Sequence, residues 1–310
     1  MTAPRVCVVG SLHYDIMVQA PYLPRPGETL IGDAWWWKAG GKGGNQAMAA
    51  ARHGAPTAMI GSLGADDFGD RLRTHLLGAG VDVRHVDTVE RGSGMSVAIQ
   101  LADGDYGAVV VSGANREIDP ARIAAGAEAI TGSHVLVLQQ EIGEPANVAA
   151  ARLARDAGVI VVLNAAPARP LGGIAGLVDV LVVNTVEAEM LGGGAVTDLP
   201  RAATAAHALQ ALAPTVIVTA GGAGLAACSP DQAFTIGAHP VAQPETHGAG
   251  DVFVGALAAR LAAATTLAKA LRYANAAAAL HVGTPERERA ACSPADVWRL
   301  LSEPGTDAVP

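Results

Sequence analysis

The residues that could do chemistry fall in four short segments of the chain. The segment nearest the C-terminus reads His247-Gly248-Ala249-Gly250-Asp251 and runs into the apolar residues 252–254. Small residues let the backbone pass close to a ligand, and successive amides at a helix start bind anions. Asp251 would then be a carboxylate in the first helical turn, placed either to accept a proton from a ligand or to cap the helix. The segment alone leaves both roles open.

A second segment, Gly40-Gly41-Lys42-Gly43-Gly44-Asn45-Gln46, holds four glycines in five positions. Glycine weakens any regular element, so we expect these glycines to bring the backbone close to a polar ligand and not to serve packing. Lys42 and Asn45 would then donate hydrogen bonds of the kind that a polyol needs. A flexible hinge is the alternative for the same segment.

The third and fourth segments each follow an apolar run. Asn184-Thr185-Val186-Glu187 comes after residues 180–183, and Thr219-Ala220-Gly221-Gly222-Ala223-Gly224 comes after residues 216–218. Ligands bind beyond the carboxyl ends of strands in open α/β sheets, so both segments are candidate nucleotide contacts. The alternatives are a Glu187 carboxylate favoured by the dipole of the next helix, and a β-hairpin into residues 225–228.

Short β-branched runs alternate with helical patterns and predict the frame that positions these segments. Most runs are apolar on both faces, as are strands of a parallel sheet covered by helices. We predict strands over 5–10, 57–61, 134–138, 159–163, 180–183 and 216–219, and helices over 44–54, 68–78, 145–157, 200–212, 250–261, 265–282 and 294–301. The alternation predicts an α/β fold with a doubly wound, mostly parallel sheet flanked by helices.

Two stretches interrupt the alternation. Residues 16–38 and 94–111 read as extended segments with turns at 24–27 and 102–105, and we expect a small β-sheet there, with irregular loops as the alternative. The predicted domains are an α/β domain over 1–15, 39–93 and 112–302, a small β domain over 16–38 and 94–111, and a C-terminal tail over 303–310.

The composition argues against several classes of function. The formal net charge is -8 and no Lys/Arg run exceeds two residues, so we expect neither nucleic acid nor an anionic membrane as a partner. Three cysteines without a C-x-x-C pair indicate a reducing compartment, and no signal peptide or membrane span is evident, so a cytoplasmic protein is expected.

The common nucleotide-binding motifs are missing. Ser11-Leu12-His13 follows Gly10, so the first strand does not lead into a G-x-G-x-x-G turn, and no G-x-x-x-x-G-K-[ST] loop occurs. A bound nucleotide would have to be held by another device.

In their order and spacing, the four segments resemble the ribokinase-like (PfkB) family of carbohydrate kinases. The resemblance runs from about residue 6 to residue 298 and includes the signatures G-G-K-G-x-N-Q-A at 40–47 and G-A-G-D at 248–251. Intermediate matches lie at residues 111–115, 163–169, 184–189 and 273–279. Two correctly spaced signatures, far apart in the chain, make chance agreement very unlikely.

The resemblance implies ATP-dependent phosphorylation of a sugar hydroxyl. Asp251 would deprotonate the acceptor, and the amides of Gly248, Ala249 and Gly250 would form the anion hole for the phosphoryl group. This agrees with the chemistry, because phosphoryl transfer depends mainly on positioning and charge neutralisation. The small β-sheet would be a lid that closes over the sugar and forms the interface of a homodimer.

The resemblance also implies roles for further residues. Those expected to hold the sugar are His13, Asp15, Gly41, Lys42, Asn45, Glu141 and Asp251. Those expected to hold ATP are Asn184, Thr219, Gly221, Gly224, Gly250 and Asn275. Glu187 would hold Mg²⁺ through water, and Glu245 would stand beside a monovalent cation, K⁺.

Some features depart from the family pattern. His13 and Tyr14 replace a small amide and an alanine before Asp15, which would change the hydrogen bonding and the volume beside the sugar. Glu245 stands in place of aspartate, and the loop 283–289 is charged where the family has glycine and alanine, so we predict weakened or altered K⁺ activation. In Trp35-Trp36-Trp37, strand alternation predicts that Trp36 faces away from its two neighbours, either for stacking on a ligand or partner lid or for packing within the lid.

The expected acceptor is ribose, phosphorylated to ribose 5-phosphate. His13 and Tyr14 favour the alternative that the same chemistry acts on a fructose-type ketohexose or a nucleoside. An alternative of another class is a catalytically idle sugar- or nucleotide-binding protein, against which the intact Asp251, Lys42, Asn184 and Glu187 argue.

Overall fold

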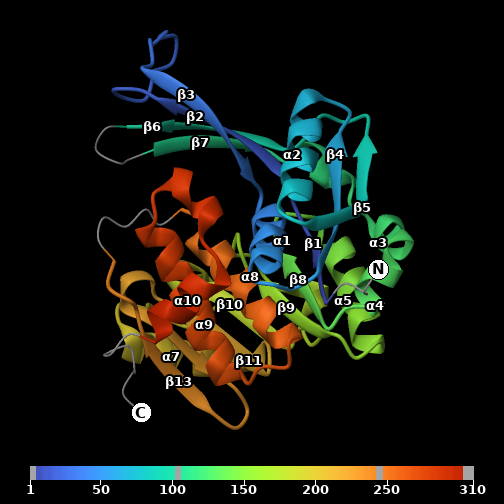
Figure 1. Ribbon diagram of the computed structural model, residues 1–310, viewed down its shortest axis with the longest axis vertical. Helices are drawn as coiled ribbons and strands as arrows, with labels where there is room; N and C mark the ends of the chain where they lie inside the picture. The colour runs from blue at the N-terminus through green and yellow to red at the C-terminus, as the bar shows by residue number, and fades with distance from the viewer. Residues whose placement is uncertain (1–4, 102–105, 242–246, 303–310) are drawn as a thin grey trace.

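The computed structural model describes residues 5–101, 106–241 and 247–302 and confirms the predicted α/β fold (Figure 1). Nine strands form one sheet, in which every neighbouring pair from β11 to β5 is parallel and β12 and β13 add an antiparallel edge. In spatial order the strands are β13 (Ala233–Gly237), β12 (Gly224–Cys228), β11 (Thr215–Thr219), β10 (Val180–Asn184), β9 (Ile160–Asn164), β8 (Val135–Gln139), β1 (Val6–Val9), β4 (Thr57–Gly64) and β5 (Val81–Val89).

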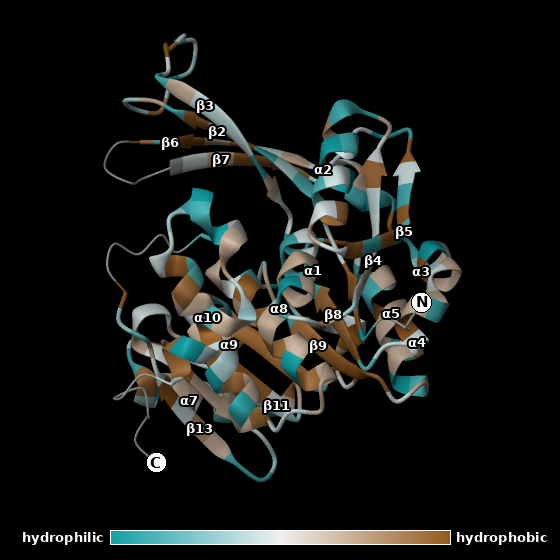
Figure 2. Cartoon of the chain, viewed as in Figure 1, coloured by the Kyte–Doolittle hydropathy of each residue, from teal (hydrophilic) through white to brown (hydrophobic). Residues whose placement is uncertain are grey.

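Two layers of helices cover the sheet because its strands are apolar on both faces. In β1, Val6 and Val8 join one buried cluster while Cys7 and Val9 join the other. The first cluster includes side chains of α1 (Lys42–Arg52), α2 (Asp67–Gly78), α8 (Ala249–Ala262), α9 (Leu267–Gly283) and α10 (Pro294–Leu301). The second includes side chains of α3 (Pro120–Ala125), α4 (Ala127–Thr131), α5 (Glu144–Asp156), α6 (Thr185–Met190) and α7 (Leu199–Ala208). Figure 2 shows the hydrophobic central strands between these helices.

A separate four-stranded sheet projects from the main body beside α2 (Figure 1). It has the order β3-β2-β6-β7, with β2 (His13–Gln19) antiparallel to β3 (Ala34–Gly40) and parallel to β6 (Met95–Gln100). The last strand, β7 (Tyr106–Val111), pairs antiparallel with β6. The predicted small β-sheet is therefore present, and its strands run back into the main sheet close to the N-terminus of α1.

Five 3₁₀ turns complete the described elements: η1 (Gly113–Glu117), η2 (Gly172–Ile174), η3 (Leu209–Ala211), η4 (Gly221–Ala223) and η5 (Glu286–Ala291). No helix within the described ranges is long and apolar enough to span a bilayer. The predicted turn at 102–105 and the predicted tail at 303–310 lie outside the described residues.

Helices α1 and α8 pack closely because Gly255 has no side chain. A Cβ atom at Gly255 would lie 2.5 Å from the Cβ of Ala49 and 2.6 Å from the carbonyl oxygen of Gln46. The close approach brings the first turn of α8, which carries Asp251, against the first turns of α1. These two helices thereby bring together the two signatures that lie far apart in the chain.

The sequence pattern missed the edge strands β5 and β13 and the short helices α3, α4 and α6. Strand β5 is an edge strand in which polar residues interrupt the apolar ones, and so it lacks the continuous apolar run that marked the central strands. The three helices have only five or six residues each, too short for a helical period to be read.

Candidate active site

Asp251 is buried at the start of α8, and its carboxylate is held by α1. Its Oδ1 accepts a hydrogen bond from Nε2 of Gln46 at 2.9 Å, and its Oδ2 accepts one from Nδ2 of Asn45 at 3.1 Å. The N-cap of α8 is Gly248, with φ of 80°, so Asp251 does not cap the helix. Burial raises the pKa of the Asp251 carboxyl and Glu141 adds to the rise, whereas Lys42, Gln46 and Asn45 oppose it.

The glycines before Asn45 serve close packing, contrary to our expectation from the sequence. A Cβ atom at Gly43 would lie 2.6 Å from the carbonyl carbon of Gly10, and one at Gly41 would lie 2.8 Å from the backbone of Leu12. Gly41 also has φ of 82° as the N-cap of α1, a conformation that side chains disfavour. The glycines therefore let α1 begin directly against the segment that follows β1.

Glu141 connects three segments at the carboxyl ends of β1 and β8. Its Oε2 accepts from the backbone amide of Lys42 at 2.9 Å and also from the hydroxyl of the fully buried Ser11. Lys42 is close enough to lower the pKa of both Asp251 and Glu187. The predicted sugar-side residues Lys42, Asn45, Glu141 and Asp251 thus lie in one cluster of acids, a cation and an amide.

His13 and Asp15 lie on one face of the small sheet, where strand alternation places them. Oδ1 of Asp15 accepts from the hydroxyl of Ser96 at 2.5 Å, and Asp15 pairs in register with Lys38 of β3. His13 is 6% exposed, and its Nε2 has no hydrogen-bond partner among the described residues. A buried polar atom without a partner is costly, so Nε2 is suited to hydrogen-bond a ligand.

Tyr14 points to the opposite face and does not change the volume beside Asp15 as the sequence suggested. Its ring stacks between Trp37, at 4.8 Å, and Phe68 of α2, at 4.1 Å. The register of β2 and β3 confirms that Trp36 faces away from Trp35 and Trp37. Trp37 packs between Tyr14 of the small sheet and His75 of α2, whereas Trp35 is 70% exposed.

Asn184 and Glu187 form a capping box at the start of α6. Oδ1 of Asn184 accepts from the amide of Glu187, and Oε2 of Glu187 accepts from the amide of Asn184, both at 2.8 Å. Glu187 thus stabilises the start of α6, as the alternative interpretation expected, but its carboxyl also interacts with the charges of the site. Burial raises the pKa of the Glu187 carboxyl and the charge of Asp251 adds to the rise, against the Asn184 amide and Lys42, so Glu187 belongs to the same electrostatic cluster.

Thr219 pairs in register with Asn184, which places two candidate ATP contacts side by side at the ends of β10 and β11. The turn that follows is the hairpin expected as the alternative, since β11 and β12 are antiparallel and η4 joins them. Gly221 and Gly224 lie at the two ends of this turn. A Cβ atom at Gly224 would lie 2.1 Å from the carbonyl oxygen of Ile236, so close packing requires that glycine.

Of the remaining predicted site residues, Asn275 lies apart from this cluster and Glu245 is not described. Nδ2 of Asn275 donates to the carbonyl of Gly237 at 2.8 Å and thereby ties α9 to β13. Glu245 lies outside the described residues. In the charged loop 283–289, Nε of Arg289 donates to the carbonyls of His281 and Thr284, each at 3.0 Å. The positive charge of Arg289 beside these two carbonyls disfavours a cation at the same oxygens.

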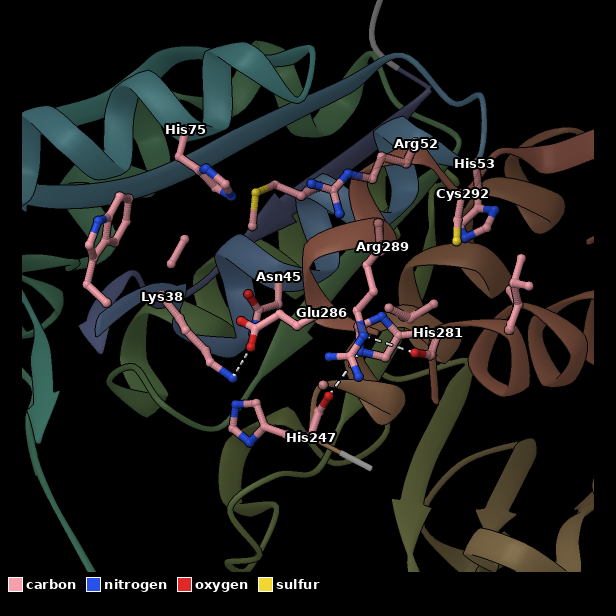
Figure 3. A pocket seen from close by; sticks show the side chains of 18 residues that line it. Lys38, Asn45, Arg52, His53, His75, His247, His281, Glu286, Arg289 and Cys292 are labelled. Atoms are coloured by element: carbon pink, nitrogen blue, oxygen red, sulfur yellow. Dashed lines mark hydrogen bonds and ion pairs between the residues drawn. The ribbon is translucent and has the colours of Figure 1, made fainter. Parts of the chain in front are cut away.

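A cavity of about 340 Å³ lies beside Asn45, between the small sheet, α1, α9 and η5 (Figure 3). Lys38 of β3 forms an ion pair with Glu286 of η5 at 2.8 Å across it. Nε2 of His281 hydrogen-bonds the carbonyl of His247, directly before the α8 N-cap Gly248, at 3.0 Å. The charged loop thus contacts the small sheet, and α9 contacts the residue that precedes the N-cap of α8.

Sequence reasoning missed the buried polar residues behind the site. Ser11, Gln46 and Gln139 are fully buried, and Asn164 is 8% exposed. Their positions at or just beyond strand ends, or inside a glycine-rich helix start, were the signal available. Within the described residues, no group of three or more His, Cys, Asp or Glu could hold a metal ion.

Comparisons with known proteins agree on one family. A model of the family described as pfkB family carbohydrate kinase matches residues 3–291. The chain is 34% identical over 278 residues to a ribokinase from Bacillus subtilis, covering 89% of this chain and 92% of that protein. It is 32% identical over 257 residues to a deoxyribokinase from Salmonella typhi, covering 82% of this chain and 84% of that protein.

The solved structure of a ribokinase from Arabidopsis thaliana, complexed with ribose and ATP, is similar, with a TM-score of 0.89 and 30% sequence identity. The similarity covers 97% of this chain and 99% of that one.

Proposed function

We propose that this chain, which belongs to the pfkB family of carbohydrate kinases, transfers a phosphoryl group from ATP to a hydroxyl of ribose and produces ribose 5-phosphate and ADP. One observation carries the proposal. The carboxylate of Asp251 is buried at a helix N-terminus, hydrogen-bonded by Gln46 and Asn45, and lies in the field of Lys42 and Glu141. A base, a cation and an anion-binding helix start are the groups that phosphoryl transfer needs.

In the proposed reaction, Asp251 takes the proton of the acceptor hydroxyl as the new O–P bond forms. A carboxylate can do this because the proton leaves only as the oxygen bonds to phosphorus, and a raised pKa makes Asp251 a better acceptor. The amides of Gly248, Ala249 and Gly250 at the start of α8 would stabilise the charge on the phosphoryl group. His13, Asp15, Gly41, Lys42, Asn45 and Glu141 would hold the sugar.

On the nucleotide side, Asn184, Thr219, Gly221, Gly224 and Asn275 would contact ATP. Glu187 would hold Mg²⁺ through water, and the ion would supply charge neutralisation between the phosphates. The residues fit such a site, because Mg²⁺ prefers oxygen ligands and usually keeps several waters beside one or two carboxylates and the substrate phosphates. Glu187 is a mostly buried carboxylate within this cluster.

Ribose is favoured as the acceptor because several curated relatives are ribokinases and a structural neighbour was complexed with ribose and ATP. The deoxyribokinase relatives make 2-deoxyribose a second candidate. The unpaired Nε2 of His13 still favours an acceptor with a hydrogen-bonding group beyond those of ribose, such as a ketohexose or nucleoside. Tyr14 supplies no such argument, because it packs away from the site.

The test is an ADP-release assay with ribose, 2-deoxyribose, fructose and a nucleoside, run on wild type and on Asp251→Asn. We expect ribose to give the highest kcat/KM, and Asp251→Asn to lower kcat on the order of 10²- to 10⁴-fold, the usual contribution of a general base. Thermal unfolding of both proteins controls for loss of the fold. Preference for a nucleoside would contradict ribose as acceptor, and ligand binding without turnover would indicate the idle binding protein.

Three further roles belong to the same proposal. The small sheet, predicted over 16–38 and 94–111 and formed by β2, β3, β6 and β7, would act as a lid domain that closes over the sugar and excludes water, which would otherwise compete for the phosphoryl group. Its exposed Trp35 and Val109 would contact a second lid in a homodimer. The free thiols of Cys7, Cys228 and Cys292 favour the reducing cytoplasm.

A further inference from the structure

A chain of buried amides lies behind Asp251 and joins α1 to two strands of the main sheet. Nε2 of Gln46 donates to Oδ1 of Asp251 at 2.9 Å and to Oδ1 of Asn164 at 3.0 Å. Oε1 of Gln46 accepts from Nε2 of Gln139 at 2.8 Å. Nδ2 of Asn164 donates to the carbonyl of Val182 at 3.3 Å. The chain therefore ends on a backbone atom that can only accept.

Counting donors and acceptors shows that this chain has one direction. Because the Val182 carbonyl accepts, the Nδ2 of Asn164 must face it, and Oδ1 of Asn164 must face Gln46. Gln46 then uses both hydrogens of its amide, one on Asn164 and one on Asp251, and keeps its own oxygen for Gln139. A flipped Gln46 amide would place oxygen against oxygen at both contacts.

The two oxygens of Asp251 consequently have different surroundings. Oδ1 faces Gln46, which is fully buried. Oδ2 faces Asn45, a residue that lines the cavity beside the small sheet. Asn45 donates one hydrogen bond to Oδ2, and a carboxylate oxygen has room to accept another.

We propose that Gln46 is a positioning residue that keeps Oδ1 of Asp251 an acceptor and leaves Oδ2 as the atom that receives the proton of the sugar hydroxyl. Gln139 and Asn164 act through Gln46 by holding its amide in one orientation. The inference rests on the proposed role of Asp251 as the base. In the reaction the sugar O–H bond breaks and its proton passes to Oδ2. The sugar oxygen bonds to phosphorus, and the P–O bond to ADP breaks with its electron pair remaining on the ADP oxygen.

The arrangement predicts how activity depends on pH. Asp251 must be ionised to act, so activity is present above its pKa and is lost as the pH falls through it. The charged groups that act on Asp251 are Lys42 of α1, Glu141 after β8 and Glu187 of α6. Loss of the Gln46 hydrogen bond removes one influence that lowers the Asp251 pKa, so the acidic limb of the kcat profile should move to higher pH.

The experiment compares Gln46→Met, Gln139→Met and the double variant with wild type, using ribose and ATP over a range of pH. Gln46→Met should lower kcat roughly 10- to 100-fold, as expected for losing a hydrogen bond to a charged group, with little change in KM. Gln139→Met should show a smaller fall and the same direction of pH shift. The double variant should be no worse than Gln46→Met, because Gln139 acts only through Gln46.

Thr57→Val is the matched control, since Thr57 is 3% exposed, donates one hydrogen bond to the carbonyl of Ala55, and lies at the amino end of β4. It should lower stability without moving the pH profile. If Gln46→Met does not fold, the pH shift of Gln139→Met decides the question. An unshifted acidic limb, or multiplicative losses in the double variant, would overturn the inference. If Asp251→Asn keeps wild-type kcat, the proposed function itself fails.

Discussion

The floor and the rim of the candidate site are built from different interactions. The floor is the buried set Asp251, Gln46, Gln139 and Asn164, in which neutral amides hold one carboxylate. The rim is the set Lys38, Glu286 and Arg289, in which Lys38 of the small sheet pairs with Glu286 of the charged loop and Arg289 donates to backbone carbonyls beside that loop. The floor is assembled from α1, α8 and central strands, whereas the rim connects elements that the main sheet does not contain.

The two regions should differ in how strongly activity depends on each of their interactions. A buried polar group left without a partner costs about 1–3 kcal/mol, so each member of the floor holds the others in place. An exposed ion pair contributes about 0–1 kcal/mol and is screened by salt. Small changes in the floor should therefore have large effects, and loss of a charge at the rim should have a small, salt-dependent one.

The largest effect in this comparison is expected for Gly255→Ala, which would push α8 away from α1 and separate Asp251 from Gln46. The added methyl would lie 2.5 Å from the Cβ of Ala49, and overpacking of this kind costs about 1–3 kcal/mol. We expect a lower melting temperature and a lower kcat. Gly78→Ala is the control, because a Cβ there meets nothing within 4 Å. Equal behaviour of the two variants would show that the α1–α8 approach is not critical.

A smaller effect is expected for Glu286→Gln, which removes the ion pair with Lys38. If the pair helps the lid to close, KM for the sugar should rise by a factor of about five, since Glu286 is 46% exposed and a pair open to solvent on one side contributes about 1 kcal/mol. The rise should shrink at high salt. Glu288→Gln makes the same charge change in the same loop, where Glu288 pairs with Arg287, and should leave KM unchanged. A rise in KM that does not depend on salt would contradict an electrostatic role of the Lys38–Glu286 ion pair.

The smallest effect is expected for potassium. Arg289 already donates to the carbonyls of His281 and Thr284, so these two oxygens do not offer an open cation site. We expect little rate gain from K⁺ when it replaces choline at constant ionic strength. A large gain of K⁺ over both sodium and choline would show the prediction to be wrong.

Much of the fold could be read from the chain because central parallel strands are apolar on both faces and keep short β-branched runs. The edge strand β5 and the helices of five or six residues could not, because they are too polar or too short to show a period. In the candidate site, the segments around Asp251 and Asn45 could be predicted to meet because both signatures belong to one family. The stacking of Tyr14 between Trp37 and Phe68 could not, since it depends on how the small sheet docks against α2.

By itself, the sequence determined the α/β class, the family and the identity of Asp251 as the candidate base, because these follow from local patterns and motif spacing. Tertiary structure alone decided that Gln46 reaches Asp251 across 205 positions of the chain, and that Gly43 and Gly255 serve close packing. It also decided that Arg289 pairs with loop carbonyls. The physical reason is that a hydrogen bond or a close contact needs two partners, and a linear pattern shows only one of them at a time.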